Sequence, residues 1–356
     1  MEFMSLEGLR SEIDSLDSKI VKLLNERAKI VQKIGEIKKQ MSAQVYVPNR
    51  EKEVYEKIIA QNNGPLSNEC LTTIYRELIA GSRALEKVLK VSYLGPEGTF
   101  SYLAAKQRFG SSVEYLSSKS IDAVFKDVIS GRADYGIVPV ENSTEGGIRE
   151  TLNMFTEYDV KVCAEIVLPI HHNLMANCPP NQIRKIYSKL QVFAQCKQWL
   201  ANNFTNVELL NVGSTTEAVQ IAKQQSDAAA IAHAEVAQLY GINILYKNIE
   251  DNPNNITRFF VLSNKPCSRS GRDKTAVMCY IRNEPGALYG ILAPFKEHSI
   301  NLTNIEPLPT KRRTWDYCFY LDFEGHTDED NVSKALEEVS SKCIELKVLG
   351  SYPRSD

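Results

Sequence analysis

The most constraining feature of this sequence is an apolar seam near its N-terminus. Between residues 5 and 40 there is no proline, and apolar side chains recur at alternating spacings of four and three. The seam consists of Leu9, Ile13, Leu16, Ile20, Leu23, Ile30, Ile34 and Ile37. This period predicts one long helix with a coiled-coil-like stripe. Such a helix extends for about 50 Å, too long for a small bundle, so we expect a second copy of the chain to pack against it.

One position of the seam is charged. Four residues after Leu23 the seam reaches Arg27, where the pattern calls for an apolar side chain. A buried guanidinium needs an anion, which is either a glutamate of a packed helix or a bound ligand. Lys38 lies about 20° around the helix from Arg27, so both share one face and could converge on a small dianion.

Two further helices are expected before residue 90. Pro48 suits the first turn of the second helix, and Asn62-Asn63-Gly64-Pro65 ends it. Ser67 is a suitable N-cap for a third helix that reaches about Lys90. Ser82 and Glu86 lie on one face of that helix, four residues apart.

The pattern changes after residue 90. Strand-like runs at 91–95, 135–140, 160–170, 228–232 and 258–263 alternate with helix-like stretches. This alternation predicts an α/β domain with a parallel sheet. A polar linker (264–274) follows, and the remaining chain reads βαββαβ, a ferredoxin-like plan with a solvated basic turn at 311–313.

Three short strings lie at the ends of predicted strands: GPEGTFS (95–101), VPVENSTEGG (138–147) and NNITRFF (254–260). None has the spacing of a P-loop or a dinucleotide fingerprint. Each supplies hydroxyls, amides and backbone N–H groups where α/β sheets bind ligands, and helix N-termini suit carboxylates. Any one string can be an ordinary turn, but three in one domain favour a ligand site.

Composition excludes several classes of protein. A net charge of -2 provides no basic field for nucleic acid. No apolar run approaches membrane-spanning length, and no signal-peptide core is visible, so we expect a cytoplasmic protein. The eight cysteines form no CxxC pair and have no zinc-ligand spacing, so we expect reduced thiols and no metal.

The N-terminal string LRSEIDSLDSKIVKLLNERAKIVQKIGEIKK, followed by VPNREKEVY, resembles the all-helical chorismate mutase domain. The resemblance implies that chorismate is held by Arg10 (from the partner chain), Arg27, Arg50, Glu51 and Ser82, with Lys38 and Glu86 at its ether oxygen. The rearrangement to prephenate is intramolecular. It needs only a compact bound conformer and cations near the oxygen that gains negative charge.

Two positions depart from that family. Val47 stands where many relatives have an acid, which removes a good N-cap. Glu86 stands where some relatives have Gln, and a carboxylate would repel the developing oxyanion. Glu86 would therefore have to be protonated, and we expect mutase activity to decline as pH rises.

Residues 91–264 resemble prephenate dehydratase through the three strings. The resemblance implies two α/β lobes around a cleft, as in periplasmic ligand-binding proteins. It implies Thr257 as proton donor, with Asn142 and Gln195 positioning the substrate, while the cleft is lined by Thr99, Ser101, Glu141, Ser188, Ser214, Thr215 and Arg258. Lys189-Leu190 replaces the His-Pro pair of many relatives, and His171-His172 is interpreted as structural. Prephenate would lose water and CO₂ without any metal or organic cofactor.

The strings EPGALYGIL and LTNIEPLPTKRRTWDYCFYLDFEG resemble the ACT amino-acid-binding module. The resemblance implies feedback inhibition by L-phenylalanine and a homodimer or larger assembly. Gly286, Ala287 and Leu288 match one contact motif, and Glu306 begins the second. That second motif reads EPLP where the family usually reads ESRP.

The sequence thus predicts an all-α three-helix mutase domain (1–90), a bilobed α/β dehydratase domain (91–266) and an α+β ferredoxin-like ACT domain (275–356). The predicted function is a bifunctional enzyme of phenylalanine biosynthesis that converts chorismate to prephenate and prephenate to phenylpyruvate. Two alternatives stay open. One is a monofunctional dehydratase whose helices only dimerise, and the other is a non-catalytic amino-acid sensor.

Overall fold

The computed structural model describes residues 5–41, 45–309 and 317–355. The basic turn expected at 311–313 lies outside these ranges. The chain forms two compact units, each described separately below. The first is Met1–Leu89 with Phe109–Glu114, and the second is Lys90–Arg108 with Tyr115–Asp356.

The described residues of the first unit form three helices: α1 (Leu6–Gln40), α2 (Pro48–Gln61) and α3 (Asn68–Glu86). The single long N-terminal helix is confirmed, whereas α3 ends four residues earlier than expected because a strand begins at Lys90. Ser67 caps α3 through its side chain, and Val47 gives α2 no side-chain cap. Gly35 is buried where α1 meets α3, since a Cβ there would lie 2.7 Å from Glu86 Cγ.

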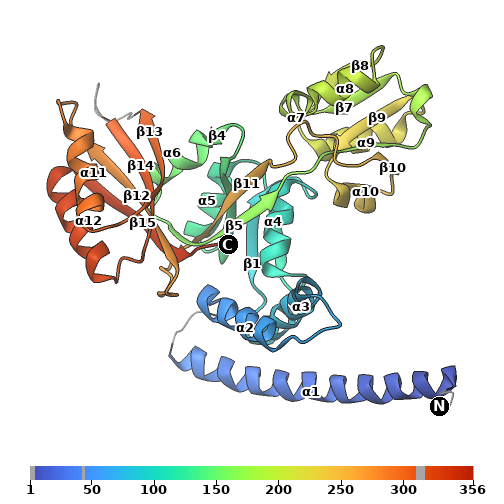
Figure 1. Cartoon of the computed structure of the whole chain (residues 1–356), viewed down its shortest axis with the longest axis horizontal. Helices are drawn as coiled ribbons and strands as arrows, with labels where there is room; N and C mark the ends of the chain where they lie inside the picture. The colour runs from blue at the N-terminus through green and yellow to red at the C-terminus, as the bar shows by residue number, and fades with distance from the viewer. Residues whose placement is uncertain (1–4, 42–44, 310–316, 356) are drawn as a thin grey trace. The chain divides into compact units, whose positions relative to one another are not determined.

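Helix α1 is a single long helix (Figure 1), and its apolar seam is exposed along most of its length. Leu9, Ile13, Leu16, Ile20 and Leu23 retain between 39% and 63% of their accessible surface. Each such side chain gains roughly 1.5–3 kcal/mol when it is fully buried. A stripe of this length is unusual on a helix that faces only water.

The second unit contains a mixed six-stranded sheet in the order β2-β1-β3-β11-β5, with β4 paired to β3. Its strands are β1 (Lys90–Leu94), β2 (Glu114–Ser118), β3 (Tyr135–Asn142), β4 (Gly146–Gly147), β5 (Lys161–Pro169) and β11 (Ile256–Ser263). Strands β1 and β3 are parallel, but β11 is antiparallel to both of its neighbours. The expectation of a parallel sheet therefore holds for β1 and β3 but is wrong for β11, which enters from the opposite end after a long excursion. The helices of this part are α4 (Phe100–Phe109), α5 (Ile121–Ile129) and α6 (Arg149–Glu157).

That excursion, between β5 and β11, forms a second mixed sheet in the order β10-β6-β9-β7-β8. Its strands are β6 (Asn173–Ala176), β7 (Lys185–Ser188), β8 (Glu208–Asn211), β9 (Ala228–Ala232) and β10 (Ile244–Tyr246). Its helices are the 3₁₀ turn η1 (Pro180–Gln182), α7 (Leu190–Gln195), α8 (Lys197–Asn203), α9 (Thr215–Gln224) and α10 (Ala234–Tyr240). The chain thus crosses between the two sheets twice, after β5 and before β11.

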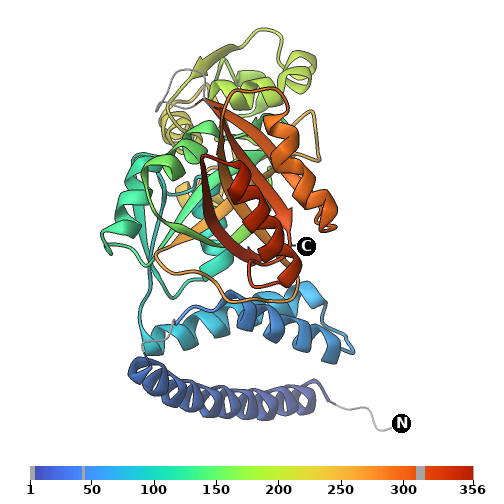
Figure 2. The same cartoon turned by 90° about the vertical axis from the view of Figure 1, so that its left-hand side faces the viewer.

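The last part is an antiparallel sheet in the order β13-β14-β12-β15. Its elements are β12 (Asp273–Ile281), α11 (Ala287–Glu297), β13 (Leu302–Pro309), β14 (Tyr317–Glu324), α12 (Asp330–Lys342) and β15 (Glu345–Pro353). Helices α11 and α12 cover one face (Figure 2). The other face places Met278, Tyr320 and Tyr352 in one core with Val138 and Phe260 of the six-stranded sheet. Strand β11 therefore lies close to the C-terminal sheet as well as to the excursion.

Candidate functional site

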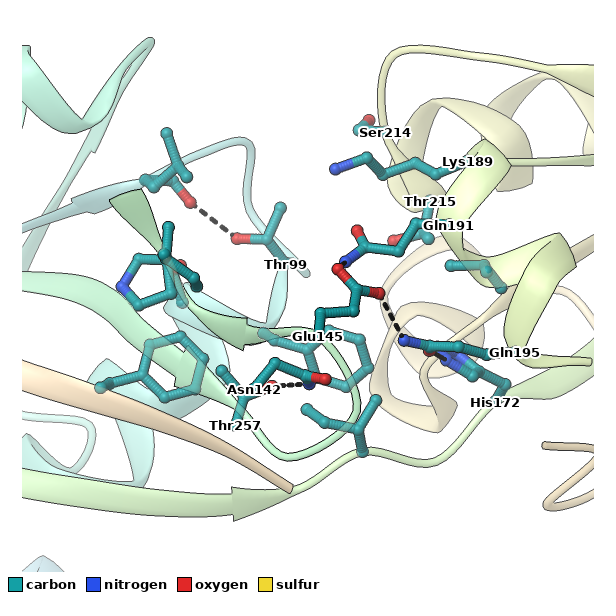
Figure 3. Close-up of a pocket in the computed structure, with 18 of the residues that line it drawn as sticks. Thr99, Asn142, Glu145, His172, Lys189, Gln191, Gln195, Ser214, Thr215 and Thr257 are labelled. Carbon is teal, nitrogen blue, oxygen red and sulfur yellow. Dashed lines mark hydrogen bonds between the residues drawn. The ribbon is translucent and has the colours of Figure 1, made fainter. Parts of the chain in front are cut away.

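A pocket of about 240 Å³ lies where the six-stranded sheet and the second sheet meet (Figure 3). Seven of the residues expected from the sequence line it: Thr99, Ser101, Asn142, Gln195, Ser214, Thr215 and Thr257. Three others do not line it. Ser188 is fully buried and donates to the Ile231 carbonyl at 2.8 Å, while Glu141 and Arg258 lie on another face of the sheet.

Asn142 and Thr257 form the centre of the pocket. They are direct partners in the β3–β11 pairing, and both are buried. Asn142 Nδ2 donates to Thr257 Oγ1 at 2.8 Å and to Asn255 Oδ1 at 3.0 Å. The Thr257 oxygen accepts in this bond, so its own O–H remains able to donate to a bound molecule.

Glu141 and Arg258 are the next pair along the same two strands. Neighbouring strand residues point to opposite faces, so these side chains turn away from the pocket. Arg258 Nη1 lies 2.6 Å from Asp322 Oδ2, and Arg258 Nη2 donates to Tyr320 Oη at 3.0 Å. Arg258 thereby ties β11 to the C-terminal sheet.

This contact belongs to a buried cluster of charges. Lys274 Nζ lies 3.2 Å from Asp322 and 3.3 Å from Glu165, and Tyr352 donates to Asp322 at 2.9 Å. Burial raises the pKa of the Tyr352 hydroxyl well above its ordinary value, so it stays a donor. Two cations face two buried carboxylates, with Glu141 at the edge, so the cluster is nearly neutral.

His172 belongs to the pocket wall, where the sequence indicated only a structural role. Its Nε2 lies 2.7 Å from Gln195 Oε1. Burial lowers the pKa of His172, so the ring is neutral at physiological pH. The sequence carried a signal for this placement, because His172 follows the end of β5, and side chains at strand ends formed the basis for the other pocket residues.

Three further polar residues line the pocket: Glu145 and Gln191, for which no role was predicted, and Lys189, which the sequence marked only as replacing part of a His-Pro pair. Glu145 follows β3, and its carboxylate accepts hydrogen bonds from Gln191 Nε2 and, at 3.1 Å, from Gln195 Nε2. Lys189 precedes α7. These contacts join the two sides of the pocket.

Helix N-termini supply further donors to the pocket. Ser214 caps α9 by accepting from the Glu217 N–H at 3.0 Å, and Thr215 opens the same helix. On the opposite side, Thr99 precedes α4 and donates to the Leu94 carbonyl at 2.9 Å. Both termini present backbone N–H groups and positive dipole ends, which favour anions.

The first unit brings together two pairs of predicted residues between α1 and α3. Arg27 Nη1 donates to Ser82 Oγ at 2.7 Å. Lys38 Nζ lies 3.4 Å from Glu86 Oε2 and donates to the Val45 carbonyl at 3.2 Å. The Glu86 side chain is 5% exposed, and its Oε2 has no hydrogen-bond partner among the residues that the structure describes. Arg27 and Lys38 therefore do share one face, as predicted.

The other expected mutase residues lie differently. Glu51 is buried and forms an ion pair with Arg83, 3.0 Å between oxygen and nitrogen, a partner that the sequence did not indicate. Arg50 is exposed and pairs with Glu53 at 2.6 Å. Arg10 is exposed on α1, in the part that carries the apolar seam.

The four residues expected to bind an effector fall into two groups. Gly286 and Ala287 line a pocket of about 590 Å³ beside the end of α12, and Leu288 is 37% exposed. Glu306 instead accepts a hydrogen bond from the Gly147 N–H at 3.2 Å. Leu308, part of the EPLP departure, is buried in the core shared with the six-stranded sheet.

The part of the chain that the structure describes has neither a metal-binding group of side chains nor a membrane-spanning helix. No group of three or more His, Cys, Asp or Glu side chains there is arranged to hold a metal ion. None of the helices described above combines the length and apolar character needed to cross a membrane.

Comparison with known proteins matches each unit to a family. Residues 9–87 match the model for chorismate mutase type II, and residues 91–267 match the model for prephenate dehydratase. A bifunctional chorismate mutase/prephenate dehydratase of Aquifex aeolicus is 46% identical over 98% of both chains, and one of Pseudomonas aeruginosa is 41% identical over the same shares. A crystal structure of prephenate dehydratase from Arthrobacter aurescens in complex with L-Phe has a TM-score of 0.70 at 31% identity, covering 75% of this chain and 90% of that one.

Proposed function

Because the chain belongs to the family of bifunctional chorismate mutase/prephenate dehydratases, we propose which of its residues carry the two reactions. The enzyme rearranges chorismate to prephenate, then dehydrates and decarboxylates prephenate to phenylpyruvate in phenylalanine biosynthesis. The observation that carries the residue assignment is the Asn142–Thr257 pair in the pocket.

For the dehydratase, Thr257 is the proton donor. Its O–H gives a proton to the C4 hydroxyl of prephenate, which leaves as water while the ring carboxylate leaves as CO₂. The electron pair of the broken C–C bond completes the aromatic ring, and Thr257 regains a proton from solvent. Asn142 holds the threonine oxygen in place, and Gln195 positions the substrate.

For the mutase, Arg27 and Lys38 hold chorismate between α1 and α3, with Ser82 lining the site. Lys38 meets the ether oxygen as negative charge develops there, and Glu86 turns from Lys38 to that oxygen when it is protonated. Glu51 receives the ring hydroxyl while Arg83 holds its carboxylate. Arg50 reaches the substrate only by leaving Glu53.

The chorismate mutase site is completed by a second copy of the chain. The exposed seam of α1 suits a second copy of the same helix, and Arg10 lies in that stretch. In such a homodimer each Arg10 serves the partner's pocket. Support comes from the length of the stripe, which is too apolar to stay in water.

The C-terminal part is an ACT domain of ferredoxin-like fold that senses L-phenylalanine. Support comes from its βαββαβ order and from the relative whose crystal structure holds L-Phe. The bond from Gly147 to Glu306 provides a route to catalysis, because Gly147 closely follows Asn142, the last residue of β3, and Glu145 in the turn after it. The enzyme works in the cytoplasm; support comes from its eight cysteines, all among the described residues, which form no disulfide, as is usual in reducing compartments.

A single assay tests this assignment. Chorismate is supplied to the purified enzyme, and its loss and the appearance of phenylpyruvate are followed together. The bifunctional enzyme consumes chorismate and forms phenylpyruvate. A dehydratase whose helices only dimerise would act on supplied prephenate alone, and a sensor would act on neither.

A feedback test uses Glu306→Ala, which removes the acceptor of the Gly147 N–H bond. L-phenylalanine inhibits the dehydratase of the unchanged enzyme, and the variant needs several times more effector for the same inhibition. Equal inhibition curves would exclude Glu306 as part of the route.

A further inference from the structure

A carboxylate of the chain itself occupies the polar side of the dehydratase pocket. Glu145, in the turn after β3, accepts hydrogen bonds from the side-chain amides of Gln191 and Gln195 (Figure 3). Both amides belong to α7, on the other side of the pocket. Two amide N–H groups that converge on one carboxylate form a small anion-binding arrangement.

The oxygen end of the Gln195 side-chain amide contacts His172. Its Oε1 can only accept a hydrogen bond, so His172 Nε2, at 2.7 Å, must carry the proton. The NH₂ group at the other end of this amide faces the pocket and donates to Glu145. The arrangement is thus prepared for a carboxylate whether or not Glu145 is the one that fills it.

The Glu145 side chain can move out of the pocket. It is exposed, it lies in a turn, and the next residue, Gly146, has a positive φ of 80°. Neither Gln191 nor Gln195 depends on Glu145 for its place in α7. The carboxylate can therefore turn outward with rotations of its own side chain.

Electrostatics favour displacement of the Glu145 carboxylate by the substrate. Prephenate carries two carboxylates, and Glu145 is the only Asp or Glu among the described pocket residues. Lys189 is the only Lys or Arg among them. With Glu145 in place the pocket has no net positive charge to offer a dianion. With Glu145 outside, Lys189 and the two amides remain.

We propose that Glu145 is an internal competitor of the substrate: it occupies the Gln191–Gln195 amide pair in the empty enzyme and is displaced by a carboxylate of prephenate. This inference rests on the dehydratase function proposed above. The carboxylate that binds there is the one on the pyruvyl side chain. Donors placed on the ring carboxylate would stabilise a charge that must vanish as CO₂ forms, which would slow the reaction.

Internal competition has a defined kinetic signature. If the subsite is open for only a fraction of the time, the apparent dissociation constant is the intrinsic one divided by that fraction. Removing the competitor lowers KM and leaves the chemical step alone. Phenylpyruvate keeps the same side-chain carboxylate, so its affinity rises in parallel.

The test compares Glu145→Gln and Glu145→Ala with the unchanged full-length enzyme. We expect KM for prephenate and Kd for phenylpyruvate to fall about three- to tenfold, with kcat within about twofold, as for an inhibitory state that is mostly occupied. Glu150→Gln, which removes an exposed acidic charge five residues away on α6, is the matched control and leaves all three values unchanged. Chorismate mutase activity, measured on the same samples, reports that the variants are folded.

Other outcomes overturn the proposal. A tenfold or larger loss of kcat in Glu145→Gln would place Glu145 in the chemical step. A rise in KM would make it a substrate ligand, and unchanged KM and Kd would leave it without a role in binding. If the unchanged enzyme failed to convert prephenate at all, the proposed dehydratase function would fail first, and that result is separate from any effect of Glu145.

Discussion

Asn142 and Thr257 face each other across the β3–β11 pairing, with Asn142 Nδ2 2.8 Å from Thr257 Oγ1. This bond fixes which way the threonine hydroxyl can donate. We expect Thr257→Ala to lower dehydratase kcat by about 10²- to 10⁴-fold, the usual contribution of a positioned acid. Thr257→Ser keeps the hydroxyl and should retain much more activity. The measurement is single-turnover conversion of prephenate.

Mutase activity provides the internal control for this experiment. The mutase residues belong to the other compact unit, so both Thr257 variants should rearrange chorismate at the normal rate. If Thr257→Ala kept most of the dehydratase kcat, another group would have to supply the proton, and the assignment would be withdrawn.

Arg258 is expected to matter for stability rather than for substrate binding. It is buried against Asp322, Tyr320 and Glu165 on the face away from the pocket. Arg258→Met leaves Asp322 short of one cationic partner in a dry environment, which costs roughly 3–5 kcal/mol of unfolding free energy. Urea unfolding measures this loss, while KM for prephenate should change less than about twofold, as for a residue outside the pocket. A large rise in KM in folded Arg258→Met would instead restore the sequence-based role in binding.

The two pairs 141–142 and 257–258 explain what could be predicted from the sequence and what could not. The strings ENS and TRF located the pocket, because polar residues at strand ends meet at one edge of an α/β domain. They did not indicate which member of each pair faces the ligand. Strand alternation decides this as soon as one residue is placed, so Thr257 in the pocket turns Arg258 out of it.

Other features depend on contacts between distant segments. Glu145 reaches α7 across 46 residues of chain, and Glu306 reaches Gly147 across 159. No local pattern encodes such pairs. Arg83, the partner of Glu51, was missed for the same reason, whereas the face shared by Arg27 and Lys38 followed from helix geometry alone.

The substitution Glu86→Gln is expected to raise mutase activity rather than lower it. Its buried carboxylate lies 3.4 Å from Lys38 Nζ, so it holds the cation that the ether oxygen needs. Glu86→Gln releases Lys38 and supplies an amide donor, so kcat/KM for chorismate should rise at neutral and alkaline pH. The pH–rate profile of the mutase should also become flatter, because an amide at this position stays neutral at every pH. An unchanged profile would exclude Glu86 from the reaction.

Shared mutase sites in a homodimer can be tested by mixing inactive variants. Arg10→Ala and Arg27→Ala should each abolish most mutase activity while leaving dehydratase activity normal. When the two are unfolded together and refolded, a site that combines Arg27 of one chain with Arg10 of the other is intact. With random pairing in a twofold dimer, about a quarter of the normal activity returns. No recovery in a mixture that contains folded dimers would show that each site uses residues of one chain only.

Because His233 is buried, the free energy of unfolding is expected to fall at acid pH. Burial, with smaller effects from the nearby His171 and His172, lowers its pKa from 6.5 to about 4. The unfolded chain therefore binds this proton first, and the free energy of unfolding falls as pH drops from 6.5 toward 4, by at most about 1.4 kcal/mol per pH unit for one group. His233 also caps α10 by accepting from the Glu235 N–H, a role that asparagine can keep. His233→Asn should thus show a shallower decline of urea midpoint over this pH range than the unchanged chain. If the urea midpoints of the variant and the unchanged chain declined in parallel, His233 would have the same pKa in the folded and the unfolded chain.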